Sequence, residues 1–342
     1  MKALLPAVLG LIALGPAPLG AQQARPEPNF KDVVYGSENP ASQRLDVYLA
    51  KSDDPAPKPT MIYLHGGGWR AGSKAPIPAF LARGVAEGWL SVVAIEYRFT
   101  DIAPHPAQVN DCVRGIQFAR SKAKEWNLDP RRFGVTGGSA GGHLSLWIGL
   151  HDDAAKPDDA DPVRRESSRV SCVVDFAGPS DWGLLGTIDH KHPAYRQLLG
   201  YEPGTPAAEM DAAKKSDVSP VTFVSKDDPP VIVFHGDADD IVPIEHAKNV
   251  ASLLEKSGVP VELFIVPGGK HNVAGGAGEG VQERAYAYVR EHLLGARKKR
   301  APRDKRGEVG RLKWEGNKQE RRAESLRSEI SRFPLQQIRR PG

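Results

Sequence analysis

The chain has 342 residues, of which 40% are hydrophobic and 26% charged, which excludes a disordered chain and is typical of a globular protein with a hydrophobic core. The net charge of +4 is unevenly distributed, because residues 297–342 hold 16 Lys and Arg against 6 Asp and Glu, while the part before them is net negative. The only cysteines, Cys112 and Cys172, are too few for a disulfide framework, and we expect two buried free thiols.

The N-terminal segment has the pattern of an export signal. A single lysine is followed by an apolar stretch that prolines and glycines interrupt, and small residues end it at Ala21. A retained membrane anchor is the alternative, although the interruptions argue against it. We therefore predict a signal peptide over residues 1–21 and an exported domain, periplasmic or extracellular, over residues 22–295.

Short apolar runs and helical patterns alternate along this domain. After a proline-rich lead-in at residues 25–38, strand-length runs occupy residues 43–50, 60–68, 90–98, 132–138, 171–178, 229–237 and 261–269. Helical spacing occurs at residues 106–126, 142–150, 245–258 and 278–295. Continuous Val and Ile runs are typical of strands that are buried on both faces. The alternation predicts an α/β fold with a mostly parallel central sheet and helices on both faces.

One segment breaks the alternation. Residues 178–229 are rich in Asp, His, Pro and Gly and show little strand character. A segment of this length within an α/β domain is usually a lid or a binding insert. We predict a small lid or insert here.

The sequence Gly-Gly-Ser-Ala-Gly at residues 137–141 places Ser139 between a predicted strand and a predicted helix. This context is that of a nucleophile elbow, a strained turn that exposes a reactive serine. A phosphate-binding loop would need Lys and Ser or Thr after the glycines, where His143 and Leu144 stand instead. We predict that Ser139 is a nucleophile.

A second glycine motif, His-Gly-Gly-Gly-Trp at residues 65–69, follows an earlier predicted strand. Attack by serine on an acyl carbon produces an oxyanion, which backbone N–H groups stabilise. Glycines allow the substrate to approach such a loop closely. We predict an oxyanion hole formed by the N–H groups of Gly67, Gly68 and Ala140, the residue after the serine.

A serine nucleophile also needs a base and an acid that orients the base, in the chain order serine, acid, histidine. The end of one predicted strand offers Asp237, Asp239 and Asp240 as the acid. The end of the next offers His271 as the base. The residues alone do not choose among the three acids.

These motifs, in this order, resemble those of the α/β-hydrolase superfamily, and more narrowly the acetylesterase and feruloyl-esterase-like carboxylesterases near the hormone-sensitive-lipase group. The likeness runs from about Asp46 to Leu294. The resemblance implies that Asp239, three residues before Val242, is the acid, and it implies no metal or organic cofactor. The chain departs from the family at Asn272, where glycine usually follows the histidine.

The sequence therefore predicts an exported serine carboxylesterase that hydrolyses short-chain acyl esters, such as acetyl or feruloyl esters of plant polysaccharide, with Ser139, Asp239 and His271 as catalytic residues. The expected partner is a small-molecule or polysaccharide-linked ester. Amides, lactones and peptides stay open as substrates, because the fold alone does not choose the reaction. A non-catalytic binding module on the same scaffold is the alternative from another class.

Several other polar and aromatic residues have structural interpretations. The family resemblance implies that His65 braces the glycine loop through hydrogen bonds, and we expect His143 and His235 to be structural as well. Trp69 and Trp182 either line an acyl pocket or pack in the core.

Two further groups contain ligand-type side chains. His151, Asp152 and Asp153 have the residue types of a metal site, but a solvent-exposed acidic loop explains them equally simply. His190 and His192 belong to the insert, where they either contact substrate or contribute to a polar surface.

The basic residues 296–342 form a segment with few apolar residues, and we predict a disordered tail. Its positive charge suits attachment to acidic polymers or to an anionic membrane surface. We expect no nucleic-acid partner, because no recognition motif is present.

Overall fold

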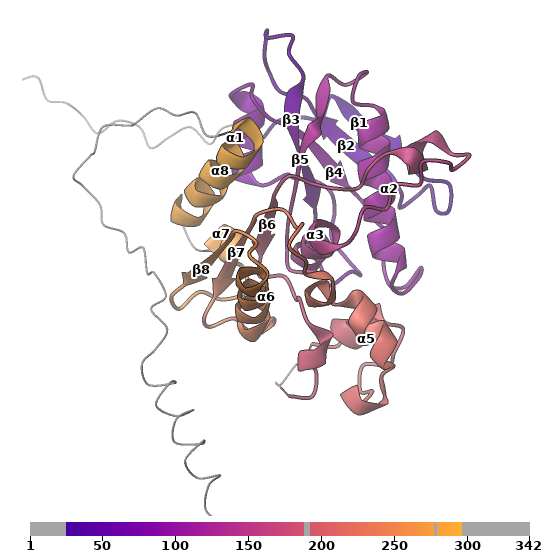
Figure 1. Cartoon of the computed structure of the whole chain (residues 1–342), viewed down its shortest axis with the longest axis vertical. Helices are drawn as coiled ribbons and strands as arrows, with labels where there is room; N and C mark the ends of the chain where they lie inside the picture. The colour runs from indigo at the N-terminus through magenta and orange to yellow at the C-terminus, as the bar shows by residue number, and fades with distance from the viewer. Residues whose placement is uncertain (1–24, 188–191, 277–278, 296–342) are drawn as a thin grey trace, which may run out of the picture. The chain divides into compact units, whose positions relative to one another are not determined.

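A computed structural model of the chain describes residues 25–187, 192–276 and 279–295 (Figure 1). Its centre is an eight-stranded sheet with the strand order β1-β2-β4-β3-β5-β6-β7-β8. The strands are Phe30–Val34 (β1), Arg44–Tyr48 (β2), Lys58–Leu64 (β3), Ser91–Ile95 (β4), Leu128–Gly138 (β5), Val173–Phe176 (β6), Val231–Gly236 (β7) and Val261–Val266 (β8). Strand β2 is antiparallel to β1 and β4, and the remaining neighbours are parallel.

Helices cover both faces of the sheet (Figure 1). The longer ones are Ala79–Ala86 (α1), Ala107–Ser121 (α2), Ala140–Leu150 (α3), Glu245–Lys256 (α6) and Glu279–Leu294 (α8). Buried side chains of α2, α3 and α6 share one hydrophobic cluster with the sheet, and those of α1 and α8 share another. These two clusters confirm the predicted α/β fold with a mostly parallel sheet.

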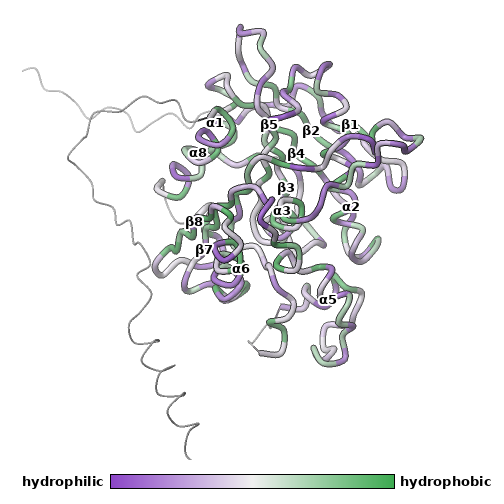
Figure 2. The backbone as a smooth tube through the Cα atoms, in the orientation of Figure 1, coloured by the Kyte–Doolittle hydropathy of each residue, from purple (hydrophilic) through white to green (hydrophobic). Residues whose placement is uncertain are grey.

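Hydrophobic residues concentrate along the strands (Figure 2). All five residues of β4 and all six of β7 are buried, as expected for central strands of a sheet covered on both faces. Cys112 on α2 and Cys172 before β6 are buried free thiols, which confirms that prediction. None of the helices among the described residues is long and apolar enough to cross a membrane.

Strand β1 and helix α1 were not predicted. Residues 25–38, expected to be a lead-in only, contain the edge strand β1, whose five residues are exposed or half-buried. The charged residues Lys31 and Asp32 interrupt the apolar alternation that identifies a strand. Helix α1 is only eight residues long and begins after Pro78, so its periodic signal is short.

The predicted insert lies between β6 and β7. Its described part contains only short helices, namely Trp182–Leu184 (η2), Ala194–Leu198 (α4), Ala207–Glu209 (η3), Ala212–Val218 (α5) and Pro220–Phe223 (η4). Asp181 and Asp211 cap η2 and α5 by accepting backbone N–H groups. The absence of strands in this described part agrees with the sequence pattern.

The signal peptide predicted over residues 1–21 and the tail predicted over residues 296–342 both lie outside the described residues.

Candidate active site

The predicted site residues follow the carboxyl ends of parallel strands. The glycine loop follows β3, Ser139 follows β5, Asp239 follows β7 and His271 follows β8. Parallel strands direct these ends to one edge of the sheet, where ligand sites of α/β proteins form. The topology therefore brings together residues that are far apart in sequence.

Ser139 occupies a sharp turn between β5 and α3. Its backbone angles, φ 55° and ψ −121°, lie in a region that L-residues rarely adopt. Its N–H donates to the carbonyl of Phe176 at 2.8 Å, which fixes the turn to the neighbouring strand. Gly137 and Gly141 allow this turn, since a Cβ on Gly137 would lie 2.4 Å from the carbonyl carbon of Gly141. The strand–turn–helix context is that of a nucleophile elbow.

Ser139, His271 and Asp239 form a continuous chain of hydrogen bonds. The Ser139 hydroxyl donates to Nε2 of His271 at 2.8 Å, and Nδ1–H of His271 donates to Oδ2 of Asp239 at 2.9 Å. The Asp239 side chain is fully buried, whereas His271 is 24% exposed. This is the arrangement in which a histidine takes the serine proton while a carboxylate fixes its orientation. Of the three acids that the sequence offered, the structure places Asp239 against His271.

The Asp239 carboxylate has a dense set of donors. Its Oδ1 accepts the N–H groups of Ile241 and Val242 at 2.9 and 3.0 Å. Nε2 of His235 lies 3.3 Å from Oδ2 and donates to the carbonyl of Val242 at 2.8 Å. Burial favours the protonated acid, but the hydrogen bonds from His235, His271 and the backbone outweigh it and hold the pKa of Asp239 well below its usual range. Asp239 is therefore a carboxylate at neutral pH.

Asp237 and Asp240, the other two acids, have different positions. Asp237 accepts the N–H of Gly268 at 2.6 Å and closes the turn beyond β8. Asp240 is exposed.

Three backbone N–H groups stand free beside the serine. Gly67 and Gly68 have positive φ angles of 116° and 60°, and Ala140 is the first residue of α3. No acceptor among the described residues takes a hydrogen bond from these three N–H groups. A Cβ on Gly66 would lie 3.5 Å from Cβ of Ser139, so the loop and the elbow are in contact. The arrangement suits stabilisation of an oxyanion.

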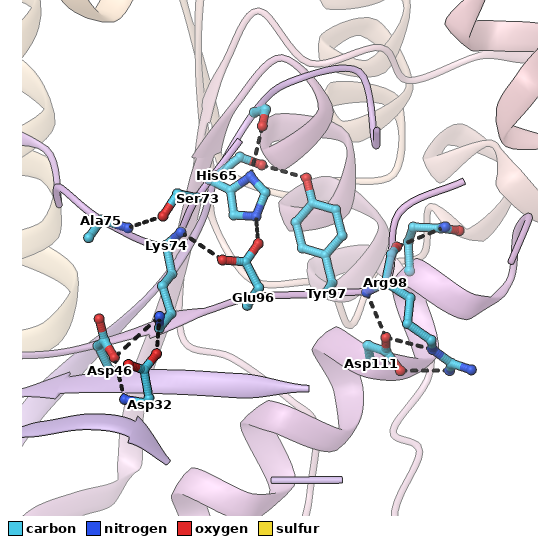
Figure 3. Close-up of polar contacts among 12 residues, drawn as sticks. Asp32, Asp46, His65, Ser73, Lys74, Ala75, Glu96, Tyr97, Arg98 and Asp111 are labelled. Atoms are coloured by element: carbon cyan, nitrogen blue, oxygen red, sulfur yellow. Dashed lines mark hydrogen bonds and ion pairs between the residues drawn. The ribbon is translucent and has the colours of Figure 1, made fainter. Parts of the chain in front are cut away.

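A network of charged side chains contacts His65, the residue that begins the glycine loop (Figure 3). His65 Nε2 lies 2.6 Å from Oε1 of Glu96, and Oε2 of Glu96 accepts the backbone N–H of Lys74 at 3.3 Å. The Lys74 ammonium donates to Asp32 at 2.7 Å and lies 3.5 Å from Asp46. The hydrogen bonds of His65 agree with its expected bracing role.

Tyr97 and Arg98, which follow Glu96 in the chain, form hydrogen bonds next to this network. The Tyr97 hydroxyl donates to the carbonyl of His65 at 2.8 Å, and its ring stacks on the imidazole at 4.4 Å (Figure 3). Arg98 makes a bidentate contact with Asp111 on α2, with distances of 2.8 and 2.7 Å. Sequence reasoning missed Glu96 and Lys74.

Trp69 and Trp182 pack in the core. Their exposures are 2% and 0%, and their ring centroids lie 5.8 Å apart. Trp69 Nε1 donates to Nδ1 of His143 at 3.1 Å, and Nε2–H of His143 donates to the carbonyl of Val218 at 2.8 Å. Burial lowers the pKa of His143 to about 3, so the ring is neutral. These two hydrogen bonds connect the glycine loop and the elbow helix to the insert, and they give His143 a structural role.

Asn272, which stands where the family usually has glycine, accepts the N–H of Gly275 at 3.0 Å. It thereby caps the short helix α7, Val273–Gly276, directly after His271.

The other ligand-type residues are dispersed. His151 stacks on Trp147 at 4.1 Å, and Asp153 accepts hydrogen bonds from Ser167 and Ser168. In the described part of the chain, no group of three His, Cys, Asp or Glu side chains could hold a metal ion. His190 lies outside the described residues.

Asp175, on β6 beneath the elbow helix, was also missed from the sequence. It is fully buried, and its Oδ1 accepts the N–H of Gly178 at 3.0 Å, while no described residue forms a hydrogen bond with Oδ2. Burial raises the pKa of Asp175 to about 7, although His235 and the Gly178 N–H oppose this shift. Because the unfolded carboxyl ionises near pH 4, the folded protein loses stability as the pH rises from about 4 to 7.

We expect Asp175→Asn to remove this penalty. The variant should be more stable than the wild type at pH 8, by on the order of 1–4 kcal/mol, with a smaller difference at pH 4.5. Thermal melts at both pH values measure the effect. Asp158→Asn, at an exposed position, is the matched control and should show no such pH trend. A pH-independent difference for Asp175→Asn would contradict the expectation.

Comparison with known proteins identifies the family of the chain. The BD-FAE family model matches residues 45–254, which is more than half of the chain. Esterase LipC from Mycobacterium tuberculosis is 32% identical over 264 residues, which cover 75% of this chain and 62% of LipC. The chain spans less than two thirds of the length of the first curated relatives that it matches.

Solved structures show the same architecture. A truncated carbohydrate esterase from gut microbiota superposes with a TM-score of 0.69 at 28% identity, covering 80% of this chain and 99% of that one. An acetyl ester-xyloside bifunctional hydrolase from Caldicellulosiruptor lactoaceticus gives 0.58 at 29% identity, covering 73% and 84%. With its mostly parallel sheet and its serine elbow, the chain belongs to the BD-FAE family, among the α/β-hydrolase carboxylesterases.

Proposed function

We propose that the chain is a serine carboxylesterase. The observation that carries this proposal is the series of hydrogen bonds from Ser139 through His271 to Asp239, beside three backbone N–H groups that donate to none of the described residues. The esterase names of the relatives support ester bonds over amides or lactones.

In the proposed mechanism, Oγ of Ser139 attacks the ester carbonyl carbon while Nε2 of His271 takes the hydroxyl proton. The carbonyl oxygen becomes an oxyanion that accepts hydrogen bonds from the N–H groups of Gly67, Gly68 and Ala140. When the bond to the alcohol oxygen breaks, His271 returns the proton to the leaving alcohol. An acyl group then remains on Ser139.

Water completes the reaction. His271 takes a proton from a water molecule, whose oxygen attacks the acyl carbon and forms a second oxyanion. When this intermediate collapses, the carboxylic acid leaves and Oγ recovers its proton from His271. Throughout, the Asp239 carboxylate holds Nδ1–H of His271 and stabilises the imidazolium.

The substrate that we propose is a short-chain acyl ester, in particular an acetyl or feruloyl ester attached to plant polysaccharide. Two structural relatives described as a carbohydrate esterase and as an acetyl ester-xyloside hydrolase support a carbohydrate ester. Export also belongs to the proposal, and the signal-like pattern of residues 1–21 supports it. For the basic tail, we propose contact with acidic polymers or an anionic membrane surface.

A series of 4-nitrophenyl esters from acetate to laurate tests the substrate class. We expect kcat/KM to be highest for acetate or propionate and to fall as the chain lengthens, and we expect release of acetate or ferulate from acylated xylan. A maximum at the long chains would contradict the short-chain proposal. A folded protein that cleaves none of these esters would instead favour a non-catalytic binding module.

A further inference from the structure

Two nitrogen-bearing side chains flank the glycine loop beside the proposed oxyanion hole. The position that a Cβ would take on Gly68 lies 3.9 Å from Cγ of Arg70 and 3.8 Å from Cε1 of His192. Arg70 is exposed and His192 is half-buried. Both side chains therefore border the place where the substrate carbonyl would bind.

Arg70 is a cation without a carboxylate partner among the described residues. Its Nη1 donates to Oε1 of Gln197 on α4 at 3.0 Å. A neutral amide orients the guanidinium but leaves its charge in place. A planar guanidinium in this state is well suited to a carboxylate, which it binds through two parallel hydrogen bonds.

His192 offers a second donor. Its Nδ1 accepts the backbone N–H of Ala194 at 3.3 Å, so the neutral ring carries its proton on Nε2. No acceptor among the described residues takes this Nε2–H. Burial lowers the pKa of His192, and the nearby Arg70 cation lowers it further.

We propose that Arg70 and His192 form a subsite for a carboxylate carried by the ester substrate, close to the scissile bond. This inference rests on the proposed esterase function and adds a substrate class to it, namely esters with an acidic substituent. The guanidinium supplies charge and paired donors, and the imidazole N–H supplies a further donor to one carboxylate oxygen.

Two matched pairs of esters test the subsite. In the first pair the leaving group differs, with 4-acetoxybenzoate as the anion and 4-acetoxybenzamide as its neutral counterpart. In the second the acyl group differs, with mono-4-nitrophenyl succinate against 4-nitrophenyl succinamate. After subtraction of the rates measured without enzyme, which include intramolecular attack by the succinate carboxylate on its own ester, we expect the wild type to favour the anionic ester of at least one pair by about five- to tenfold in kcat/KM. Salt should reduce this preference.

The Arg70→Gln variant should lose the preference and keep its rate on the neutral esters. The matched control is Arg131→Gln, because Arg131 is exposed near the opposite end of β5 from Ser139, and it should keep the preference. His192→Gln should reduce the preference by a smaller factor, since it removes no permanent charge.

Equal rates within both pairs for the wild type would overturn the subsite, and so would a preference that Arg70→Gln leaves intact. The proposed function fails separately, because the wild type would then cleave neither neutral ester. Retained activity of Arg70→Gln on the neutral esters shows that the variant is folded.

Discussion

Replacing Ser139 with alanine is expected to reduce ester hydrolysis by on the order of 10⁵–10⁶ in kcat, leaving only the rate that binding and the oxyanion hole provide. The variant removes the sole atom that would bond to the acyl group. The fold should persist, because the elbow is fixed by the Ser139 N–H and by the close packing of Gly137 and Gly141, none of which involves the hydroxyl. Steady-state kinetics on 4-nitrophenyl acetate and a thermal melt measure both results.

Ser145→Ala is the matched control for this experiment. Ser145 lies on α3, the helix that follows the elbow, is fully buried, and donates its hydroxyl to the carbonyl of Gly141 at 2.7 Å. The control should lose about 1 kcal/mol of stability and keep its activity. Retention of wild-type turnover by Ser139→Ala would exclude Ser139 as the nucleophile.

Asp239→Asn should have the second largest effect, a loss of about 10⁴ in kcat. An amide in this position presents an N–H group to Nδ1 and favours the wrong tautomer of His271, whose Nε2 then no longer accepts the serine proton. Asp240→Asn alters the adjacent, exposed acid and should keep the wild-type rate. If the Asp240 variant lost activity and the Asp239 variant kept it, the assignment of the acid would be wrong.

The effect of Asp239→Asn on stability should depend on pH. The pKa of Asp239 is lowered on folding, so its stabilising contribution is fully present above about pH 4, the ordinary pKa of Asp, and is lost as the pH falls through the lowered value. Asp239→Asn should therefore be less stable than the wild type at pH 7, by about 1–3 kcal/mol. The difference should shrink below pH 4, which thermal melts at pH 7 and pH 3 detect.

Much of the fold could be predicted from the sequence because the central strands are continuous Val and Ile runs between periodic helices. The strand β1 could not, since an exposed edge strand needs no apolar alternation and its Lys31 and Asp32 face solvent or a charged partner. Helix α1 is too short for its period to be distinctive. In both elements, pairing or packing with distant residues overrides a weak local pattern.

The positions of the site residues could be predicted because each stands in a short motif at a strand end. The partners of those residues could not. Glu96 lies 31 residues from His65, and His235 approaches Asp239 only because the turn after β7 folds back. No sequence pattern marks Arg70, which follows the glycine motif. Its proposed role in substrate binding depends on His192, which the insert brings to the same loop.

The most direct test of the proposed nucleophile is labelling with a fluorophosphonate, followed by mass spectrometry of the modified peptide. We predict one phosphonyl group per folded chain, attached to Ser139, and no labelling of the Ser139→Ala variant. Label on a different residue, or a folded wild-type protein that takes up no label while it hydrolyses esters, would contradict the proposed mechanism.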